Sequence, residues 1–266
     1  MLDADGRIRD LSGVISDLKG DALSPGGLSS LAALDPTTLP EVTGTPRLGP
    51  PVAGMTNFVC IGLNYADHAA ETGAEVPKEP IVFLKSLGAL AGPDDDIVIP
   101  PGSKKTDWEC ELAVVIGTTA RRVSLDKAMD HVAGFTIAND VSEREWQAER
   151  GGSWDKGKGF DTFGPLGPWL VTRDEIADPQ KLAMYTDVDG KRMQDGSTAT
   201  MIFGVRELVS YVSQCITLHP GDVIATGTPP GVGLGIKPQP VFLKPGQTVE
   251  LGIAGLGKQT HQTVGG

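Results

Sequence analysis

The sequence predicts a mostly β protein of the α+β class, in which a mixed β-roll or sandwich carries peripheral helices and a small N-terminal subdomain. Many short apolar runs are bounded by turn residues, and only a few segments have helical periodicity. The 266 residues also include 35 glycines and 20 prolines, which favour turns over a helical bundle. A chain of this length can bury a sizeable core.

Residues 1–52 differ from the rest because they are rich in Asp, Gly, Ser and Pro. They contain a short amphipathic stretch around Leu28–Leu34 and end in the proline-rich segment Leu48–Pro51. We interpret them as a small N-terminal subdomain with a linker, followed by a larger domain over residues 53–266.

From Asn57 onwards the chain is dense in short strands. Asp189–Gly190 has the residue types of a two-residue hairpin turn between two of them. The expected strands are Phe58–Leu63, Ile81–Leu84, Ile97–Ile99, Leu112–Ile116, Gly134–Ala138, Trp169–Thr172, Met184–Val188, Lys191–Met193, Val223–Ala225, Val241–Leu243, Val249–Ile253 and Gln259–Val264.

Four segments are expected to be helical. Tyr65 to Glu71 is a short helix closed by Gly73, and a second helix lies near Leu125–His131. Ser142 and Glu145 form a capping-box pattern that starts a helix ending near Arg150. The fourth helix covers Phe203–Ile216, and one of its sides carries Val205, Leu208, Val209, Val212 and Ile216. A glycine-rich loop is expected from Gly151 to Gly167.

The bulk composition excludes several classes of protein. A net charge of −11 argues against nucleic acid or an anionic membrane as a partner. No apolar run approaches the roughly 20 residues of a membrane span, and no basic-then-apolar leader is present. Cys60, Cys110 and Cys215 form no C-x-x-C pair and are expected to be reduced core residues of a cytoplasmic protein.

Two acids stand where acids are rare, at the mouth of the apolar run Leu112–Ile116. Glu109 and Glu111 are two residues apart, so a strand directs both carboxylates to one face. Like charges this close repel each other unless a cation lies between them, and oxygen-only ligands suit Mg²⁺, Mn²⁺ or Ca²⁺. From this stretch alone, a solvated strand end with two exposed glutamates remains an equal alternative.

Asp140 is a candidate third ligand, because it lies just past the apolar run Gly134–Ala138 and immediately before the predicted helix. Three carboxylates would leave open positions for water and a bidentate substrate. The alternative is an aspartate that caps the following helix. His68 and Glu71, three residues apart on a helix, could form a water-activating base oriented by a carboxylate, or an ordinary surface pair.

Further candidates are less specific. Arg144 and Gln147 share one face of the helix that follows Asp140. The turn Thr226–Gly233 exposes amides and hydroxyls that can hold a carboxylate, although an ordinary β-turn is the commoner meaning of its Gly and Pro residues. Lys156–Phe160 adds cations in a glycine-rich loop without the spacing of a phosphate loop.

Taken together, these residues resemble the fumarylacetoacetate hydrolase family, from about Asn57 to Val264. The resemblance implies a β-roll of packed mixed sheets and a homodimer or dimer of dimers. The motifs that carry it are, in chain order, Ile61–His68, Glu109 with Glu111, Asn139–Asp140, Lys158–Pro165 and Thr226–Gly233.

The resemblance also assigns roles to residues. It implies Mg²⁺ or Mn²⁺ on Glu109, Glu111 and Asp140, and a lid helix that carries His68 and Glu71. Lys158 matches the active-site lysine of the family. The residues expected on the substrate side are Arg144, Gln147, Thr228, Gly227, Tyr65 and Lys85.

Within the family, the segments Leu2–Leu11, Trp146–Lys158 and Pro165–Thr172 resemble the bacterial sugar-acid branch. The chain is short at its front compared with that branch. The resemblance implies a hydrolase that cleaves the C3–C4 bond of a 2,4-diketo-3-deoxy sugar acid, such as 2,4-diketo-3-deoxy-L-rhamnonate, to pyruvate and a hydroxy acid. His68, oriented by Glu71, would activate the attacking water, and Lys158 would stabilise the developing enolate.

Other activities remain open on the same metal platform. They are a ureidoglycolate lyase or an oxaloacetate decarboxylase, which need no hydrolytic water and for which His68 would matter less, and an acylpyruvase. A non-catalytic carboxylate- or metal-binding protein is the remaining alternative from a different class.

Overall fold

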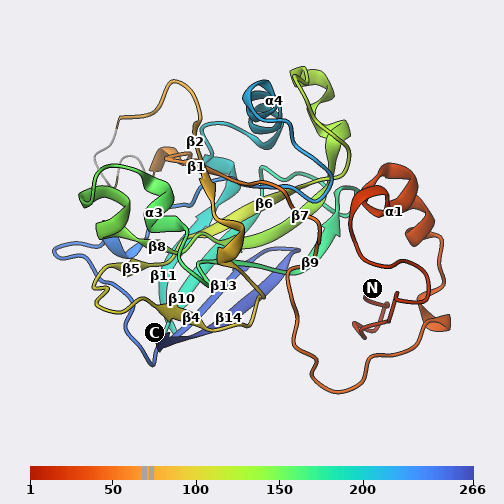
Figure 1. Ribbon diagram of the computed structural model, residues 1–266, viewed down its shortest axis with the longest axis horizontal. Coiled ribbons are helices and arrows are strands. Elements are labelled where there is room, and N and C mark those ends of the chain that lie inside the picture. The colour runs from red at the N-terminus through yellow and green to blue at the C-terminus, as the bar shows by residue number, and fades with distance from the viewer. Residues whose placement is uncertain (68–70, 72–74) are drawn as a thin grey trace.

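The computed structural model describes residues 1–67, 71 and 75–266, and its strands form two large sheets that share one core (Figure 1). The larger sheet has seven strands and mixes parallel and antiparallel pairs. Their order across the sheet is β2 (Ile81–Lys85), β1 (Phe58–Gly62), β12 (Val223–Ala225), β6 (Cys110–Ile116), β7 (Val132–Asn139), β9 (Gly164–Thr172) and β3 (Leu90–Ala91).

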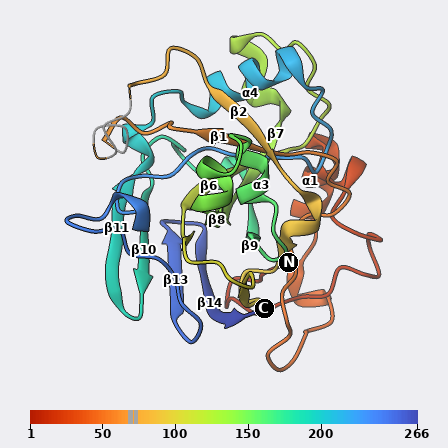
Figure 2. The same cartoon turned by 60° about the vertical axis from the view of Figure 1, so that its left-hand side comes forward.

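The second sheet has five strands, and its two hairpins lie beside the larger sheet (Figure 2). A separate two-stranded ribbon joins β5 (Thr106–Asp107) to β8 (Ser142–Glu143) in antiparallel register. The order in the five-stranded sheet is β11 (Lys191–Ser197), β10 (Ala183–Val188), β13 (Thr248–Ile253), β14 (Gly257–Gly265) and β4 (Ile97–Ile99).

Strand β6 is buried on both faces, which explains its continuous apolar run. Leu112 and Val114 on one face pack in the cluster that includes the five-stranded sheet and α4 (Val205–Cys215). Ala113 and Val115 on the other face pack in the cluster that contains Leu23. The same alternation therefore places Glu109 and Glu111 on the face of Ala113.

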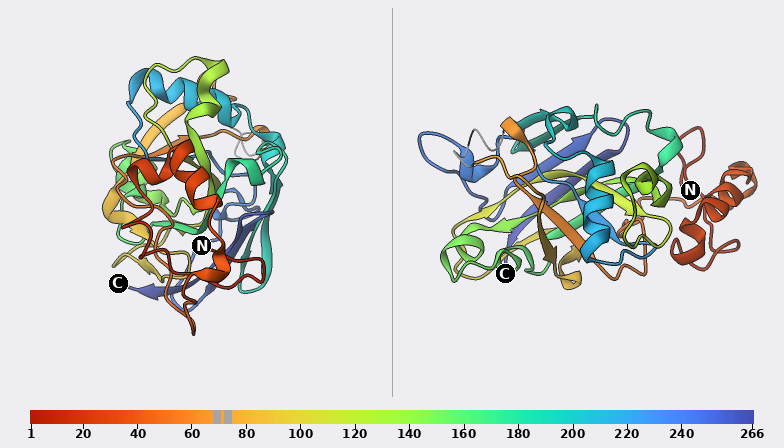
Figure 3. Two further views of the ribbon diagram at one scale, coloured as in Figure 1. Left: turned by 90° about the vertical axis from the view of Figure 1, so that its right-hand side faces the viewer. Right: turned by 90° about the horizontal axis from the view of Figure 1, so that it is seen from above.

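Residues 1–52 lie at one end of the molecule (Figure 3) and contribute Leu23 to the core of the larger sheet. Their helix α1 (Pro25–Ala32) begins at Ser24, whose Oγ accepts the N–H of Gly27. Two 3₁₀ turns flank α1, η1 (Gly20–Leu23) and η2 (Pro36–Thr38). The division of the chain at residue 52 stays a prediction.

The other helical elements are short and peripheral, apart from α4. Among the described residues, no helix has both the length and the apolar content that a membrane crossing requires. The short helical elements are η3 (Leu87–Ala89), η4 (Leu125–His131), η5 (Glu145–Glu149), α3 (Trp154–Lys158), η6 (Arg173–Glu175), η7 (Thr198–Thr200) and η8 (Gly233–Gly235).

The predicted hairpin at Asp189–Gly190 is confirmed, and both residues have the positive φ angles (50° and 74°) that such a turn requires. Most predicted strands exist with small changes at their ends, and the helix predicted over Phe203–Ile216 is α4. All three cysteines are free, as expected, but the expected core position is wrong for Cys215, which is exposed because it lies off the buried face of α4. The helix predicted over Tyr65–Glu71 falls partly outside the described residues, as do His68 and Gly73.

Other expectations were wrong. The capping box at Ser142 does not form, because this residue pairs in β8 and its Oγ donates to the carbonyl of Asp140. A π-helix, η5, follows instead, and the carboxylate of Glu143 accepts the N–H of Trp146. The segment Val241–Leu243 is no strand, since its N–H groups bond to loop and β5 carbonyls.

The loop predicted from Gly151 to Gly167 contains the helix α3 and the start of β9. The segment predicted as a helix near Leu125–His131 is the 3₁₀ helix η4. The strands β3, β5 and β8 were missed because two residues give no periodicity to detect.

Replacement of Asp222 should destabilise the fold, since this buried carboxylate accepts hydrogen bonds from Thr56, Asn57 and His219. Asp222→Asn turns one oxygen into a donor that faces other donors. We expect the free energy of unfolding to fall by about 2 kcal/mol in urea titrations. The exposed Asp174→Asn is the control, and equal stability of both variants would contradict this role.

Candidate metal centre and active site

The three carboxylates predicted as ligands come together because β6 and β7 are neighbours in antiparallel register. Glu111 lies opposite Ala138 in that register, and two residue pairs further along Asp140 donates its N–H to the carbonyl of Glu109 at 2.9 Å. The N–H of Glu109 donates to Oδ1 of Asn139 at 3.1 Å. One carboxylate oxygen of each acid lies within 4.8 Å of the others.

The chemistry of this donor set fits a divalent cation. Only 6 % of Glu109 and 1 % each of Glu111 and Asp140 are exposed, so water screens their repulsion poorly. Nζ of Lys158 lies 2.6 Å from Oε2 of Glu109 and 2.6 Å from Oδ2 of Asp140, so positive charge is already accommodated between them. Carboxylate oxygens alone are ligands for Mg²⁺ or Mn²⁺.

Lys158 reaches this position from the end of α3. Glycine at position 157 allows the approach, since a Cβ there would lie 2.5 Å from the backbone N of Gln147. Burial alone lowers the pKa of the Lys158 ammonium, but the carboxylates of Asp140 and Glu109 raise it above its ordinary value. Lys158 is therefore a permanent cation at the site.

Lys85, at the end of β2, is buried and contacts the same cluster of acids through Asp140. Its Nζ lies 2.7 Å from Oδ1 of Asp140 and donates to the carbonyls of Lys158, Phe163 and Val141 at 2.6, 2.8 and 3.2 Å. The three ammonium hydrogens are thus directed at protein acceptors. Lys85 orients the Asp140 carboxylate, a role that the sequence did not indicate.

Arg144 lies on the other side of the cluster. It contacts Gln147, so the predicted proximity of these two residues is confirmed. Its Nη1 lies 2.7 Å from Oε1 of Glu109 and donates to Oε1 of Gln147 at 3.1 Å. Burial lowers the pKa of Arg144, whereas Asp107 and Glu109 raise it, so the guanidinium stays charged. Asp107 was missed, because it ends β5, which pairs with β8 in a separate ribbon, and its side-chain partner Arg144 lies far along the chain.

The turn Thr226–Gly233 closes the site beside Glu111. The N–H of Gly227, whose φ is 94°, donates to Oε2 of Glu111 at 2.8 Å. Thr228 Oγ1 donates to the carbonyl of Cys110 at 2.9 Å and accepts Nε2 of Gln194 at 2.8 Å. Gln194, on β11, was not predicted, because nothing in its local sequence marks it.

The remaining candidates come from the segment after β1. Tyr65 is buried, its hydroxyl donates to Sδ of Met184 at 3.4 Å, and burial followed by the charge of Glu111 raises its pKa. The carboxylate of Glu71 accepts the N–H of Gly231 at 3.1 and 3.2 Å, so it lies against the turn. His68 lies outside the described residues, and its role stays a prediction.

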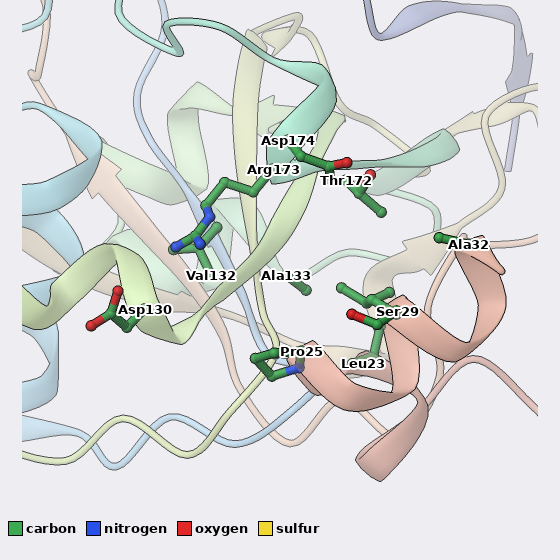
Figure 4. A pocket seen from close by; sticks show the side chains of 12 residues that line it. Leu23, Pro25, Ser29, Ala32, Asp130, Val132, Ala133, Thr172, Arg173 and Asp174 are labelled. Atoms are coloured by element: carbon green, nitrogen blue, oxygen red, sulfur yellow. The ribbon is translucent and has the colours of Figure 1, made fainter.

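A hollow of about 250 Å³ lies at another place, between α1 and the larger sheet (Figure 4). Gly117 and Val132 line it, and they stand at the ends of β6 and β7 opposite to the carboxylates. Its charged lining residues Asp130, Arg173 and Asp174 are exposed. The hollow is therefore separate from the cluster of acids.

Comparison with known proteins gives consistent matches. The family described as "Fumarylacetoacetate (FAA) hydrolase C-terminal" matches residues 57–264. A curated protein of Burkholderia ambifaria named "Putative hydrolase" is 65 % identical over 263 residues, which are 99 % of this chain and 93 % of the relative. A relative with a similar name from Burkholderia multivorans is 63 % identical with the same coverage.

Solved structures also match. Fumarylacetoacetate hydrolase from Exiguobacterium antarcticum is 38 % identical with a TM-score of 0.80, over 88 % of this chain and 83 % of that one. The 2-hydroxyhepta-2,4-diene-1,7-dioate isomerase from Mycobacterium marinum is 39 % identical with a TM-score of 0.69, over 79 % of this chain and 75 % of that one.

Divalent cations should stabilise the protein through the three acids. Mn²⁺ at 100 times its dissociation constant is expected to raise the free energy of unfolding by about 2.7 kcal/mol, measured by urea titration with and without chelator. Glu109→Gln, Glu111→Gln and Asp140→Asn should each remove most of this gain. A gain that survives all three substitutions would place the cation elsewhere.

The protonation of Glu111 should be visible in chelator-treated protein. Burial, then the charges of Asp140 and Glu109, raise its pKa well above its ordinary value of 4.5. The folded chain therefore holds this proton more tightly than the unfolded chain, and the contribution is lost as the pH rises above 4.5 through the raised pKa. The stability of the wild type relative to Glu111→Gln should therefore fall as the pH rises above 4.5, and a difference that does not change with pH would contradict this.

Proposed function

Since this chain belongs to the fumarylacetoacetate hydrolase family, we propose that it is a divalent-metal-dependent hydrolase of 2,4-diketo-3-deoxy sugar acids. It would cleave the C3–C4 bond of a substrate such as 2,4-diketo-3-deoxy-L-rhamnonate, giving pyruvate and a hydroxy acid in sugar-acid catabolism. The observation that carries the proposal is the buried group of Glu109, Glu111 and Asp140 with Lys158 between them.

The substrate and the site are complementary in charge and geometry. A 2,4-diketo acid carries a carboxylate and a neighbouring keto oxygen at one end. A Mg²⁺ or Mn²⁺ ion held by the three acids would polarise that keto group as a Lewis acid. Arg144 and Lys158 add fixed positive charge around the same point.

Different residues of the chain would act in proton transfer, in charge stabilisation and in substrate binding. His68, oriented by Glu71, would take a proton from the water that attacks the C4 carbonyl. The Lys158 ammonium would donate a hydrogen bond to the oxygen that gains negative charge when C3–C4 breaks. Thr228, Gly227 and Gln147, with Tyr65, would shape the pocket around the acid end and the tail.

A second activity is favoured by the solved structures. Two relatives at 39 % and 38 % identity are named as isomerases, of 2-hydroxyhepta-2,4-diene-1,7-dioate and of 5-carboxymethyl-2-hydroxymuconate. An isomerase would use the same cation and a proton shuttle without a hydrolytic water. A ureidoglycolate lyase and an oxaloacetate decarboxylase, which also need no hydrolytic water, remain alternatives, as does an acylpyruvase, which would use the attacking water on a simpler 2,4-diketo acid.

We also propose that the chain is cytoplasmic and works as a homodimer or a dimer of dimers. Light scattering of the purified protein measures this assembly, and a monomeric mass at micromolar concentration would refute it.

Product analysis separates these activities. Protein loaded with Mg²⁺ or Mn²⁺ is incubated with 2,4-diketo-3-deoxy sugar acids, acylpyruvates, ureidoglycolate, oxaloacetate and the two muconate-type acids, and products are identified by mass spectrometry. We expect pyruvate and a hydroxy acid from the sugar acids. Isomers of unchanged mass, glyoxylate with urea, or CO₂ would each assign a different activity.

His68→Ala tests the proposed base. The substitution should reduce turnover by roughly 10²- to 10⁴-fold, the usual contribution of a general base, because the attacking water keeps its proton. Mn²⁺ affinity should be unchanged, which distinguishes this variant from Glu109→Ala. Full turnover in His68→Ala would show that the base is another group.

A further inference from the structure

Asp107 is a buried carboxylate that lies between the two halves of the site. It ends β5 and is fully shielded from solvent. Four donors hydrogen-bond to it at 2.7 to 3.0 Å, namely the N–H groups of Trp108, Gly233 and Leu234 and Nε of Arg144, and Nη2 of Arg144 makes an ion-pair contact at 2.8 Å. Such a dense set of donors indicates an organising role.

On one side, Asp107 holds the guanidinium that contacts a metal ligand. Nε and Nη2 of Arg144 each lie 2.8 Å from its Oδ2, while Nη1 of Arg144 lies 2.7 Å from Oε1 of Glu109. The planar guanidinium therefore fixes the two carboxylates relative to each other. The Asp107 carboxylate also neutralises part of the positive charge of the Arg144 guanidinium, which contacts Glu109 at the same time.

On the other side, Asp107 holds the turn that receives Glu71. Its two oxygens accept the N–H groups of Gly233 and Leu234 at the start of η8. Nε1 of the adjacent Trp108 donates to the carbonyl of Gly231 at 3.1 Å. The N–H of that same glycine donates to Glu71, so the peptide units around it are fixed from both directions.

The turn has no spare room around Glu71. A Cβ on Gly235 would lie 2.6 Å from Oε2 of Glu71, and a Cβ on Gly233 would lie 1.9 Å from the carbonyl of Val241 and 2.8 Å from Oδ1 of Asp107. A small shift of the turn would therefore move the Glu71 carboxylate. The position of this turn depends on the amides that Asp107 accepts.

We propose that Asp107 is a positioning residue that holds Arg144 against Glu109 and, through the Gly231–Gly235 turn, fixes the position of Glu71. One side chain thereby fixes the positions of both Glu109, a proposed metal ligand, and Glu71. The inference deepens the proposed function, on which its consequence for catalysis rests. Its contacts are testable without any substrate.

Asp107→Asn is compared with Asp222→Asn, since both remove a buried carboxylate that accepts several backbone amides. Asp222 precedes β12, whose opposite end leads to the turn, so its loss should affect stability alone. Mn²⁺ affinity is measured by electron paramagnetic resonance. We expect roughly tenfold weaker binding in Asp107→Asn, as for a lost support of a metal ligand, and unchanged binding in Asp222→Asn.

Hydrogen exchange of the metal-free protein supplies an independent reading. The amide of Gly231 bonds to Glu71 and not to Asp107, so a purely local loss at position 107 would leave its exchange unchanged. We expect faster exchange at Gly231, Gly233 and Leu234 in Asp107→Asn, and wild-type exchange there in Asp222→Asn. Unchanged exchange at Gly231, or Mn²⁺ affinity equal to that of the control, overturns the proposal.

Arg144→Lys keeps the assignment testable where Asp107→Asn does not fold. A lysine retains the charge but loses the planar fork that joins Asp107 to Glu109, whereas Asp107 still accepts the N–H groups of Gly233 and Leu234. We expect weaker Mn²⁺ binding with normal exchange at Leu234, and the opposite pattern would overturn the proposal. A wild type that hydrolyses no 2,4-diketo acid refutes the proposed function, while the exchange and Mn²⁺ results still decide the role of Asp107.

Discussion

Mutual repulsion among buried carboxylates is the constraint on which the site depends. Glu109, Glu111 and Asp140 place oxygens within 4.8 Å of one another in a part of the protein that water hardly reaches. Such an arrangement is tolerated only where positive charge surrounds it. Lys158 and Arg144 contact Glu109, and both lysines of the site, Lys85 and Lys158, contact Asp140.

The sheet determines where this constraint acts. Because β6 is buried on both faces, residues at its start can point only into protein, and the antiparallel partner β7 brings Asp140 alongside Glu109. Helix α3 then delivers Lys158, which requires the close approach that glycine at position 157 allows. The site is therefore a consequence of strand register with one helix end placed over it.

The sequence was sufficient for the parts of the site that lie on regular strands. An apolar run with two acids at its mouth made Glu109 and Glu111 candidates, because a period of two directs both to one face, although a solvated strand end stayed an equal alternative until Asp140 was considered. Asp107 and Gln194 were not predictable in the same way, since their partners Arg144 and Cys110 lie 37 and 84 residues away. No local pattern encodes such contacts.

The wrong helix start at Ser142 has a related cause. The pattern Ser142 to Glu145 is a valid capping box in isolation, but the backbone there pairs with β5, and the neighbouring Glu143 accepts the amide of Trp146 and that of Lys105. Tertiary pairing overrode a local signal of about 1 kcal/mol, the usual worth of a helix cap. The same pairing brings Arg144 towards Asp107, so the departure from the local pattern helps to build the site.

The charges of the completed site indicate what it can accept. In their ionised forms, the four acids Asp107, Glu109, Glu111 and Asp140 exceed the three bases Lys85, Arg144 and Lys158 by one negative charge among the described contacts. A divalent cation turns this excess into one positive charge. A monoanionic acid bound at that cation leaves the buried cluster neutral, whereas a neutral ligand leaves a charge uncompensated, which is costly in a poorly hydrated interior. The balance therefore supports the proposal of a substrate with one carboxylate at the cation, and further polar groups of that substrate, such as the hydroxyls of a sugar-acid tail, would lie outside the cluster.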